Sequence, residues 1–387
     1  MKNKVLLLSN GYGEDLIGAS IAEKLMEKTG KNLLAAFPLV GDFGAYDKLG
    51  IHVVKCARIL PSGGFWLQKP LYLIRDLKAG LIGNFITQIK TLFSMKGEYG
   101  HAVCVGDVFL LIMAACFLKK KAYFVATAKS DRIRAHGFIE RFIMNRWSKE
   151  VLTRDEETAL SLRTRGIRAF YRGNALIEAF PKKENGLVRE DGRVIIGVLP
   201  GSRDEAYGNT ALIIGMLKKA IDSGRLPRIS IYFAVSGVLD MSVLSAAAGK
   251  AGLGLKEAPG GLAAGYSGTS FYFMKGVFAE LIKKAVIIIG LAGTANEQCA
   301  GWGLPVVAFK GCGPQTTEKR FAEQKRLLGD SLIIVKKEEE LVAAVTGLLN
   351  DPGALGRLRD YGIDRGGGPG ASAKIAVYLY ERMEACE

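Results

Sequence analysis

The sequence predicts an α/β protein of two Rossmann-like domains, each with a doubly wound parallel sheet, facing each other across a cleft. The chain has 387 residues, which exceeds one ordinary core, and its 49% hydrophobic content allows two. Short apolar runs alternate with helical stretches along both halves, as in parallel sheets with crossover helices. Residues 181–192 are polar and have no periodic pattern, which is typical of a linker.

The first domain is expected to cover residues 1–180. Its first strand is the apolar run 4–9, and a glycine-rich turn then leads into a helix whose apolar residues recur four apart. Asp15 stands where it could cap that helix. Strand, turn and helix form the opening unit of a doubly wound sheet. Further strands are expected at 32–37, 51–55, 102–105, 122–126 and 151–153.

The second domain is expected to cover residues 193–365. It repeats the alternation of strands and helices, with one helix at about 210–221. A glycine-rich turn at 366–370 and a helix at 372–383 end the chain. The strands are expected at 194–199, 229–235, 286–290, 306–309 and 332–335.

The positive charge is concentrated in the first half. The net charge is +15; residues 1–190 carry 30 Lys and Arg against 18 Asp and Glu, and residues 191–387 carry 23 against 20. This favours an anionic lipid surface, an anionic substrate or nucleic acid as partner. We rank nucleic acid last, because no binding motif accompanies the charge. The amphipathic stretch from Phe65 to Lys96 could lie on a membrane surface, or form core helices with solvated lysines.

The cysteines and the N-terminus favour a reducing compartment. The six cysteines are scattered without metal-ligand spacing, so reduced thiols and no metal are expected. The N-terminus runs into a strand with no signal-peptide cleavage site, and the longest apolar run, 108–118, is too short to span a bilayer. We therefore expect a cytoplasmic protein, either soluble or peripheral at the inner face of the membrane.

The first candidate ligand site is the turn Gly11-Tyr12-Gly13-Glu14-Asp15. It resembles a dinucleotide fingerprint, but the third glycine should fall at position 16, which is Leu. Carboxylates at a helix start repel phosphate and accept hydrogen bonds from hydroxyl groups, so Glu14 and Asp15 favour a sugar over NAD. Alternatively, Asp15 only caps the helix.

The second candidate site is Leu199-Pro200-Gly201-Ser202-Arg203, after the first strand of the second domain. Gly201 lets the backbone approach a ligand, Ser202 offers a hydroxyl and an N–H, and Arg203 offers a fork of donors that matches phosphate oxygens. No Walker lysine is present, so ATP hydrolysis is not indicated. The alternative is a strand-exit turn with a surface arginine.

The third candidate site is Gly293-Thr294-Ala295-Asn296-Glu297, which also follows a strand and opens a helix. Small residues with free N–H groups at a helix start form an anion site suited to a pyrophosphate. Glu297 could then reach the hydroxyls of a ribose. The alternative is a capping box between Thr294 and Glu297. Both turns follow strands of one sheet, so they would converge on one crevice.

The fourth candidate is Asp107, which follows the apolar run ending at Gly106. A carboxylate at the end of a strand with apolar neighbours is a candidate general base. The alternative is a helix N-cap, which the same placement explains.

Taken together, these segments resemble lipid-A-disaccharide synthase, and more closely the lipid-A-disaccharide-synthase-related proteins, over nearly the whole chain. The resemblance rests on GYGEDLIGA at 11–19, GD at 106–107, LPGSR at 199–203, GTANE at 293–297 and GCGPQTTEKRFAEQKRLLG at 311–329.

The resemblance implies the GT-B fold, with the acceptor in the N-terminal domain, a UDP-sugar in the C-terminal domain, and residues 366–387 packed back on the first domain. It implies that Arg203 contacts the pyrophosphate, Glu297 the nucleoside and Asp107 the acceptor hydroxyl, with no essential metal. The acceptor and donor cleft is assigned Gly13, Asp15 and Gln315.

Three departures from the family pattern all lie on the acceptor side. Gly106-Asp107-Val108-Phe109 replaces Pro-Asp-Phe-Asn, Thr127-Ala128-Lys129-Ser130 replaces a Trp-containing loop, and Asn174-Ala175 replaces His-Pro. The donor class is thus retained, whereas a lipid A precursor as acceptor is not supported.

The sequence therefore predicts sugar transfer from a UDP-sugar, a co-substrate rather than a cofactor, to a hydroxyl of a lipid-linked or otherwise anionic acceptor. Asp107 would act as general base, with Glu14 in reserve. Two other functions stay open: a non-hydrolysing UDP-sugar epimerase, which shares the fold, and a non-catalytic nucleotide-sugar-binding protein at a membrane surface.

Overall fold

The computed structural model describes all residues except 1–3, 41–42, 55–80, 182–185, 188–192 and 386–387. The chain divides into two compact units. Unit 1 comprises Met1–Ala179 and Gly370–Glu387, and unit 2 comprises Phe180–Pro369. Most of the expected linker, 181–192, lies outside the described residues.

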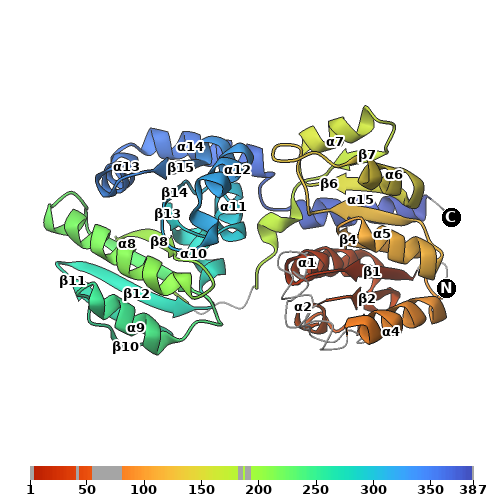
Figure 1. Cartoon of the computed structure of the whole chain (residues 1–387), viewed down its shortest axis with the longest axis horizontal. Helices are drawn as coiled ribbons and strands as arrows, with labels where there is room; N and C mark the ends of the chain where they lie inside the picture. The colour runs from red at the N-terminus through yellow and green to blue at the C-terminus, as the bar shows by residue number, and fades with distance from the viewer. Residues whose placement is uncertain (1–3, 41–42, 55–80, 182–185, 188–192, 386–387) are drawn as a thin grey trace. The chain divides into compact units, whose positions relative to one another are not determined.

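Unit 1 contains a parallel sheet, whose described strands follow the order β3-β2-β1-β4-β5-β6-β7 (Figure 1). Helices cover both faces of the sheet, so its strands are buried on both sides. The sequences of such strands are nearly continuous apolar runs. For this reason the sequence revealed every strand of this sheet except the short β7. The strands are β1 (Val5–Ser9), β2 (Leu34–Pro38), β3 (His52–Val53), β4 (His101–Gly106), β5 (Ala122–Ala126), β6 (Ser148–Thr153) and β7 (Ala169–Tyr171).

The helices of unit 1 are α1 (Tyr12–Thr29), α2 (Gly44–Asp47), α4 (Leu81–Ser94), α5 (Phe109–Met113), α6 (Phe138–Trp147), α7 (Glu156–Arg163) and α15 (Ala371–Glu384). Alternate residues of β1 enter two cores. Leu6 and Leu8 pack with α4, α5 and α6, whereas Val5 and Leu7 pack with α1, α2 and α15. The longest apolar run, 108–118, forms α5 followed by a π-helical turn, Ala114–Leu118.

The chain returns to unit 1 through α15, which lies beside α1 and buries Leu379 completely. The carboxylate of Glu178 accepts hydrogen bonds from the N–H groups of Gly370 (2.6 Å) and Ser372 (3.0 Å) at the start of this helix. A negative charge at a helix N-terminus is stabilising. Glu178 therefore fixes where the helix begins on unit 1.

Unit 2 contains a larger sheet, in the order β10-β11-β12-β9-β8-β13-β14-β15. From β12 to β15 all neighbours are parallel. The strands are β8 (Val194–Leu199), β9 (Ile229–Val235), β10 (Lys256–Ala258), β11 (Gly261–Tyr266), β12 (Thr269–Lys275), β13 (Ile287–Gly290), β14 (Val306–Phe309) and β15 (Leu332–Val335). Its helices are α8 (Glu205–Asp222), α9 (Met241–Lys250), α10 (Phe278–Lys284), α11 (Thr294–Gly301), α12 (Glu318–Leu328), α13 (Glu338–Asn350) and α14 (Pro352–Gly366).

The antiparallel pairs β10–β11 and β11–β12 differ from the purely parallel sheet that the sequence predicted. Ser267 and Gly268 join β11 to β12, both with positive φ (46° and 81°), as in a type I′ hairpin turn. β10 is the edge strand, and both it and β11 are only partly buried, so their sequences lack a continuous apolar run. β12 is mostly buried, and its apolar run was not recognised as a strand.

Each sheet has a point where the strand order reverses. In unit 1 it lies between β1 and β4, and in unit 2 between β8 and β13. Ligands of open α/β sheets bind outside the carboxyl ends of the strands at such points. Among the helices that the structure describes, none is both long and apolar enough to cross a membrane.

Candidate functional site

Unit 2 brings two of the predicted turns together. β8 and β13 are neighbours, with Leu199 opposite Gly290, and the N–H of Leu291 donates to the carbonyl of Leu199 at 2.9 Å. The turns Gly201–Arg203 and Gly293–Glu297 therefore leave the same sheet edge side by side, at the point of strand reversal.

Asn209 links the turn after β8 to a third loop, residues 310–313, which follows β14. Its side-chain amide donates to the carbonyls of Pro200 (2.8 Å) and Cys312 (3.3 Å), and its Oδ1 accepts from the N–H of Cys312 at 2.6 Å. Asn209 is completely buried in α8. Sequence reasoning missed it, although a polar residue on the otherwise apolar face of a helix was a usable signal.

Two glycines and Gln315 complete this arrangement. Gly313 has a φ of +93°, and a Cβ there would lie 2.6 Å from Cγ of Glu205, so the third loop closes over the start of α8. A Cβ on Gly293 would lie 3.2 Å from Oε1 of Gln315, which places that side chain over the start of α11. Three loops therefore converge around one edge of the unit 2 sheet.

The exposed groups at this edge are suited to an anion. Ser202, Arg203 and Thr294 are exposed, and Glu297 is half-buried. Gly201 adopts a φ of +117°, which a residue with a side chain rarely does. An exposed guanidinium beside the start of a helix offers bidentate donors and unpaired N–H groups to phosphate oxygens.

The structure corrects two expectations about α11. Asn296 is completely buried, and its amide donates to the carbonyl of Gly290 (3.1 Å) and to Oε1 of Gln324 (3.3 Å), so its side chain holds the loop instead of facing a ligand. The capping box is also wrong, because the N-cap is Gly293 and Thr294 is the first helical residue.

Unit 1 places Glu14 and Asp107 near each other at its own point of strand reversal. Asp107 follows β4 and is exposed, and its Oδ1 accepts a hydrogen bond from the N–H of Phe109 at 2.8 Å. Glu14 lies in the first turn of α1, after β1. Desolvation, together with the charge of Asp107, raises the pKa of Glu14 above its usual 4.5.

Asp15 is not the cap of α1, because the helix begins at Tyr12 with Gly11 as N-cap. Its side chain is buried, and its Oδ1 accepts from the hydroxyl of Ser9 at 2.5 Å, while the hydroxyl of Tyr46 donates to Ser9 at 3.1 Å. A buried carboxylate in such a network orders the end of β1.

Two glycines lie next to the two carboxylates in the chain: Gly13 before Glu14, and Gly106 before Asp107. No atom lies within 4 Å of where a Cβ on Gly13 would stand, and Gly13 is exposed. Gly106 has a φ of +146°, and a Cβ there would lie only 2.1 Å from Oδ1 of Asn10. Asn10 was not predicted, and only the fold brings it against β4.

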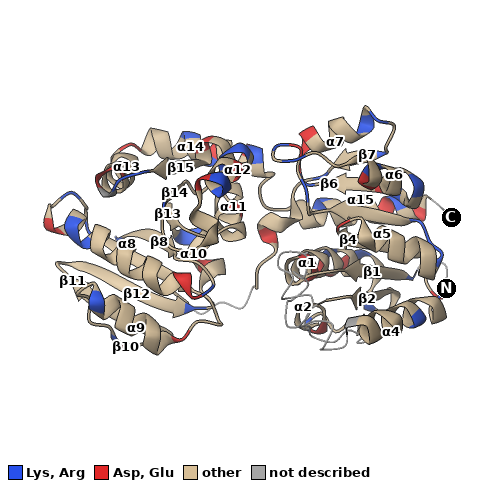
Figure 2. Ribbon diagram, viewed as in Figure 1, with Lys and Arg blue, Asp and Glu red and all other residues tan. Residues whose placement is uncertain are grey.

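The stretch from Phe65 to Lys96 is described only from residue 81 on, and residues 65–80 lie outside the described residues. The helix α4 exposes Ile82 (62%) and Phe93 (56%), while Gln88 is buried and donates to the carbonyl of Leu39 at 2.7 Å. A contiguous exposed apolar face on a helix is a feature of interaction sites. Figure 2 shows further Lys and Arg on α6 and α7 of the same unit.

Several solved structures share this fold. A UDP-GlcNAc 2-epimerase from Neisseria meningitidis bound to UDP-GlcNAc has 15% identity and a TM-score of 0.61, covering 98% of this chain and 100% of that one. MurG from Acinetobacter baumannii has 13% identity, a TM-score of 0.53 and coverage of 98% and 99%. The glycotransferase of kitacinnamycin has 13% identity, a TM-score of 0.59 and coverage of 99% for both.

At these identities the likeness shows the fold alone: two parallel-sheet α/β domains of the GT-B type. The sequence matches no protein-family model and no curated protein. The specific resemblance to lipid-A-disaccharide synthase therefore stays a prediction.

Proposed function

We propose that this protein is a glycosyltransferase that moves a sugar from a UDP-sugar to a hydroxyl of a lipid-linked or otherwise anionic acceptor. The observation that carries the proposal is the convergence of three loops at the carboxyl edge of the unit 2 sheet, two of them tied together by the buried Asn209. Such an edge, at a point of strand reversal, is where nucleotides bind in open α/β sheets.

Unit 2 would hold the donor. Arg203, together with N–H groups at the start of α11, would stabilise the UDP that departs, because negative charge grows on its diphosphate in the transition state. In this proposal Glu297 accepts hydrogen bonds from the ribose hydroxyls, and Gln315 contacts the donor beside Gly293. Charge stabilisation by these groups needs no metal.

Unit 1 would hold the acceptor and the general base. A base works best when its pKa lies near the working pH, and the raised pKa of Glu14 moves it in that direction. We propose that Asp107, which is exposed, accepts the hydroxyl proton as general base, with Glu14 as the reserve base.

In this proposal unit 1 takes its acceptor from a lipid surface. The exposed apolar side chains of α4 lie in the half of the chain that carries most of the positive charge. Apolar contact plus attraction to anionic lipid is the combination that holds proteins at membrane interfaces.

A UDP-sugar epimerase of the non-hydrolysing type is the second candidate. A UDP-GlcNAc 2-epimerase is among the structures that share the fold over the whole chain, and the departures from the synthase pattern all lie on the acceptor side. An epimerase would convert the UDP-sugar without an acceptor. Product analysis with UDP-sugar alone, and then with membrane lipid extract, separates the two candidates.

Thermal unfolding with a panel of nucleotides and nucleotide sugars tests the donor site. A ligand at 100 times its Kd adds about 2.7 kcal/mol to the stability of the native state. We expect UDP and UDP-sugars to raise the Tm, and Arg203→Ala to remove most of this effect. Arg225→Ala, which changes an exposed arginine of the same unit, is the matched control. A shift with NAD and none with UDP compounds would refute the donor site.

A further inference from the structure

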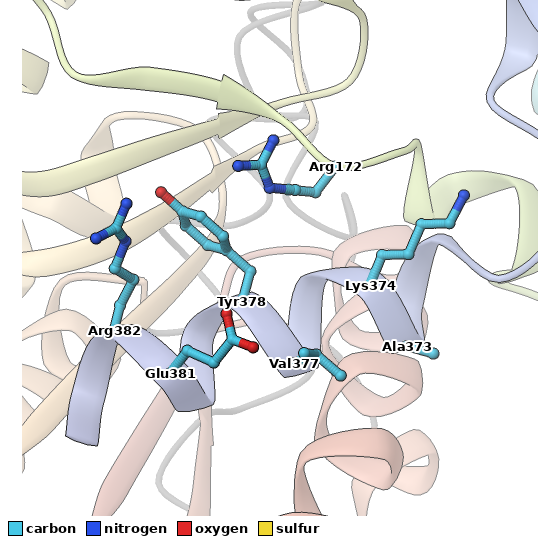
Figure 3. Close-up of a pocket in the computed structure, with 7 residues that line it drawn as sticks. All are labelled: Arg172, Ala373, Lys374, Val377, Tyr378, Glu381 and Arg382. Atoms are coloured by element: carbon cyan, nitrogen blue, oxygen red, sulfur yellow. The ribbon is translucent and has the colours of Figure 1, made fainter. Parts of the chain in front are cut away.

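Unit 1 contains a cavity of about 620 Å³ between the end of β7 and one face of α15 (Figure 3). Arg172, which follows β7, lines one side, and Lys374, Tyr378 and Arg382 line the other. The last three are spaced four apart and so lie on the same face of the helix. The cavity is separate from the carboxylates at β1 and β4, because β7 is the far edge of the sheet.

The cavity wall carries three cationic side chains, an aromatic ring and one carboxylate, that of Glu381. The guanidinium carbons of Arg172 and Arg382 lie 4.6 Å and 5.1 Å from the ring centre of Tyr378. Within the part of the chain that the structure describes, neither Arg172 nor Lys374 has an ion-pair partner. The three cations of the lining outnumber its one carboxylate, Glu381, so the excess positive charge favours an anion between them.

A buried carboxylate holds this wall in place from behind. Glu150 of β6 is 3% exposed, and it accepts hydrogen bonds from the hydroxyl of Tyr378 (2.9 Å) and from Arg168 (2.6 Å). Nε of Arg382 lies 3.6 Å from the same carboxylate. The ring and one guanidinium are therefore ordered before any ligand arrives, which lowers the entropic cost of binding.

We propose that this cavity binds the phosphate group of a phosphate ester, with Arg172, Lys374 and Arg382 as the cationic contacts. The guanidinium fork matches phosphate oxygens, and Tyr378 and Val377 offer apolar contact to the esterified part. The volume falls in the range of small-molecule sites and exceeds what a bare phosphate fills. This site is additional to the donor site proposed for unit 2. A free sugar phosphate and a phospholipid headgroup both carry such an esterified phosphate, so either could be the ligand that the two experiments below distinguish.

Calorimetric titration with glucose 1-phosphate tests the site for a free ester. The titration uses the full-length Arg203→Ala chain, so that the proposed donor site does not contribute. We expect binding that weakens at least tenfold on Lys374→Ala and on Arg172→Ala, but is unchanged by Lys28→Ala, an exposed lysine on α1 of the same unit. The side chain of Lys374 makes no hydrogen bond among the described residues, so Lys374→Ala should leave the fold intact, which the Tm checks.

Vesicle flotation tests the lipid source of the same group. We compare vesicles of phosphatidylcholine with vesicles that also contain phosphatidic acid. A phospholipid headgroup is the ligand if the protein binds the vesicles with phosphatidic acid, if Lys374→Ala weakens this binding at least tenfold, and if glucose 1-phosphate does not bind. If neither probe binds, or if Lys374→Ala and Arg172→Ala bind both probes as the parent does, the cavity is not a phosphate site. That result leaves the donor site of unit 2 untouched, since UDP binding is measured separately with Arg203 present.

Discussion

At the scale of single residues, Glu14 has the most informative environment. Its half-buried carboxyl has a pKa raised by desolvation first, and by Asp107 as well. A carboxyl whose pKa is raised on folding adds stability below its unfolded value, about 4.5, and that contribution is lost as pH rises through the folded pKa. The ionised Glu14 therefore destabilises the native state at neutral pH, as strained functional groups often do.

We expect Glu14→Gln to be more stable than wild type at pH 7, by an amount that shrinks as pH falls toward 4.5. Its transfer activity should fall by roughly 10²-fold or more, if Glu14 takes part in proton transfer. Urea unfolding from pH 4 to pH 8 measures the first effect and initial rates the second. Glu98→Gln, at an exposed position, is the control. Equal stabilities at all pH values would contradict the assignment.

The hydrogen bonds of Asn209 lead to a second prediction at this scale. Asn209→Ala should destabilise the protein by roughly 2–4 kcal/mol, because it leaves the buried carbonyl of Pro200 and the N–H of Cys312 without their partners. It should also weaken UDP binding, since two of the three loops lose their tie. Leu212→Ala, on the exposed side of the same helix, should change the unfolding free energy by less than about 0.5 kcal/mol. Wild-type UDP affinity in Asn209→Ala would show that the loops do not form the donor site.

At the scale of elements, the end of β4 depends on a glycine. Gly106→Ala should cost at least about 2 kcal/mol, because φ is +146° and the new Cβ meets Oδ1 of Asn10. In an Asn10→Ala background the contact is gone but the backbone strain remains, so the cost should be smaller and not zero. A double-mutant cycle by chemical denaturation gives the coupling. Additive costs would mean that the two residues do not touch.

The packing of α15 against α1 leads to a further prediction about stability. Leu379→Ala should lower stability by about 2–5 kcal/mol, since the side chain is completely buried against α1. Val377→Ala, which is 39% exposed on the same helix, should cost well under half as much. Similar losses in the two variants would indicate that α15 is not docked as described.

At the scale of the whole molecule, the chain crosses between its units twice. Residues 1–179 need α15 to complete a core that contains Ile375 and Leu379, whereas unit 2 is continuous in sequence. A chain ending at Pro369 should therefore lose or sharply lower the unfolding transition of unit 1, while that of unit 2 persists. Differential scanning calorimetry of both chains checks this. A single transition, shifted as a whole, would show instead that the units unfold together.

The amino-acid sequence by itself was enough to predict most of the parallel strands and the loops that follow them, although β7 and β12 were missed. Strands buried on both faces need unbroken apolar runs, and the glycine-rich turns after them are local features. Gly201–Arg203 and Gly293–Glu297 were found in this way, as were Glu14 and Asp107. β10 and β11 at the edge of the unit 2 sheet were missed, because half-exposed strands carry a weaker pattern.

Only the tertiary structure decided what each polar side chain does. Asp15 and Asn296 are residue types that often contact ligands. The fold buries both side chains, and each makes a hydrogen bond to a neighbouring part of its unit. Asn209 and the cavity beside Tyr378 depend on segments more than 100 residues apart in the chain. Burial and partner are set by residues distant in sequence, so no local pattern contains them.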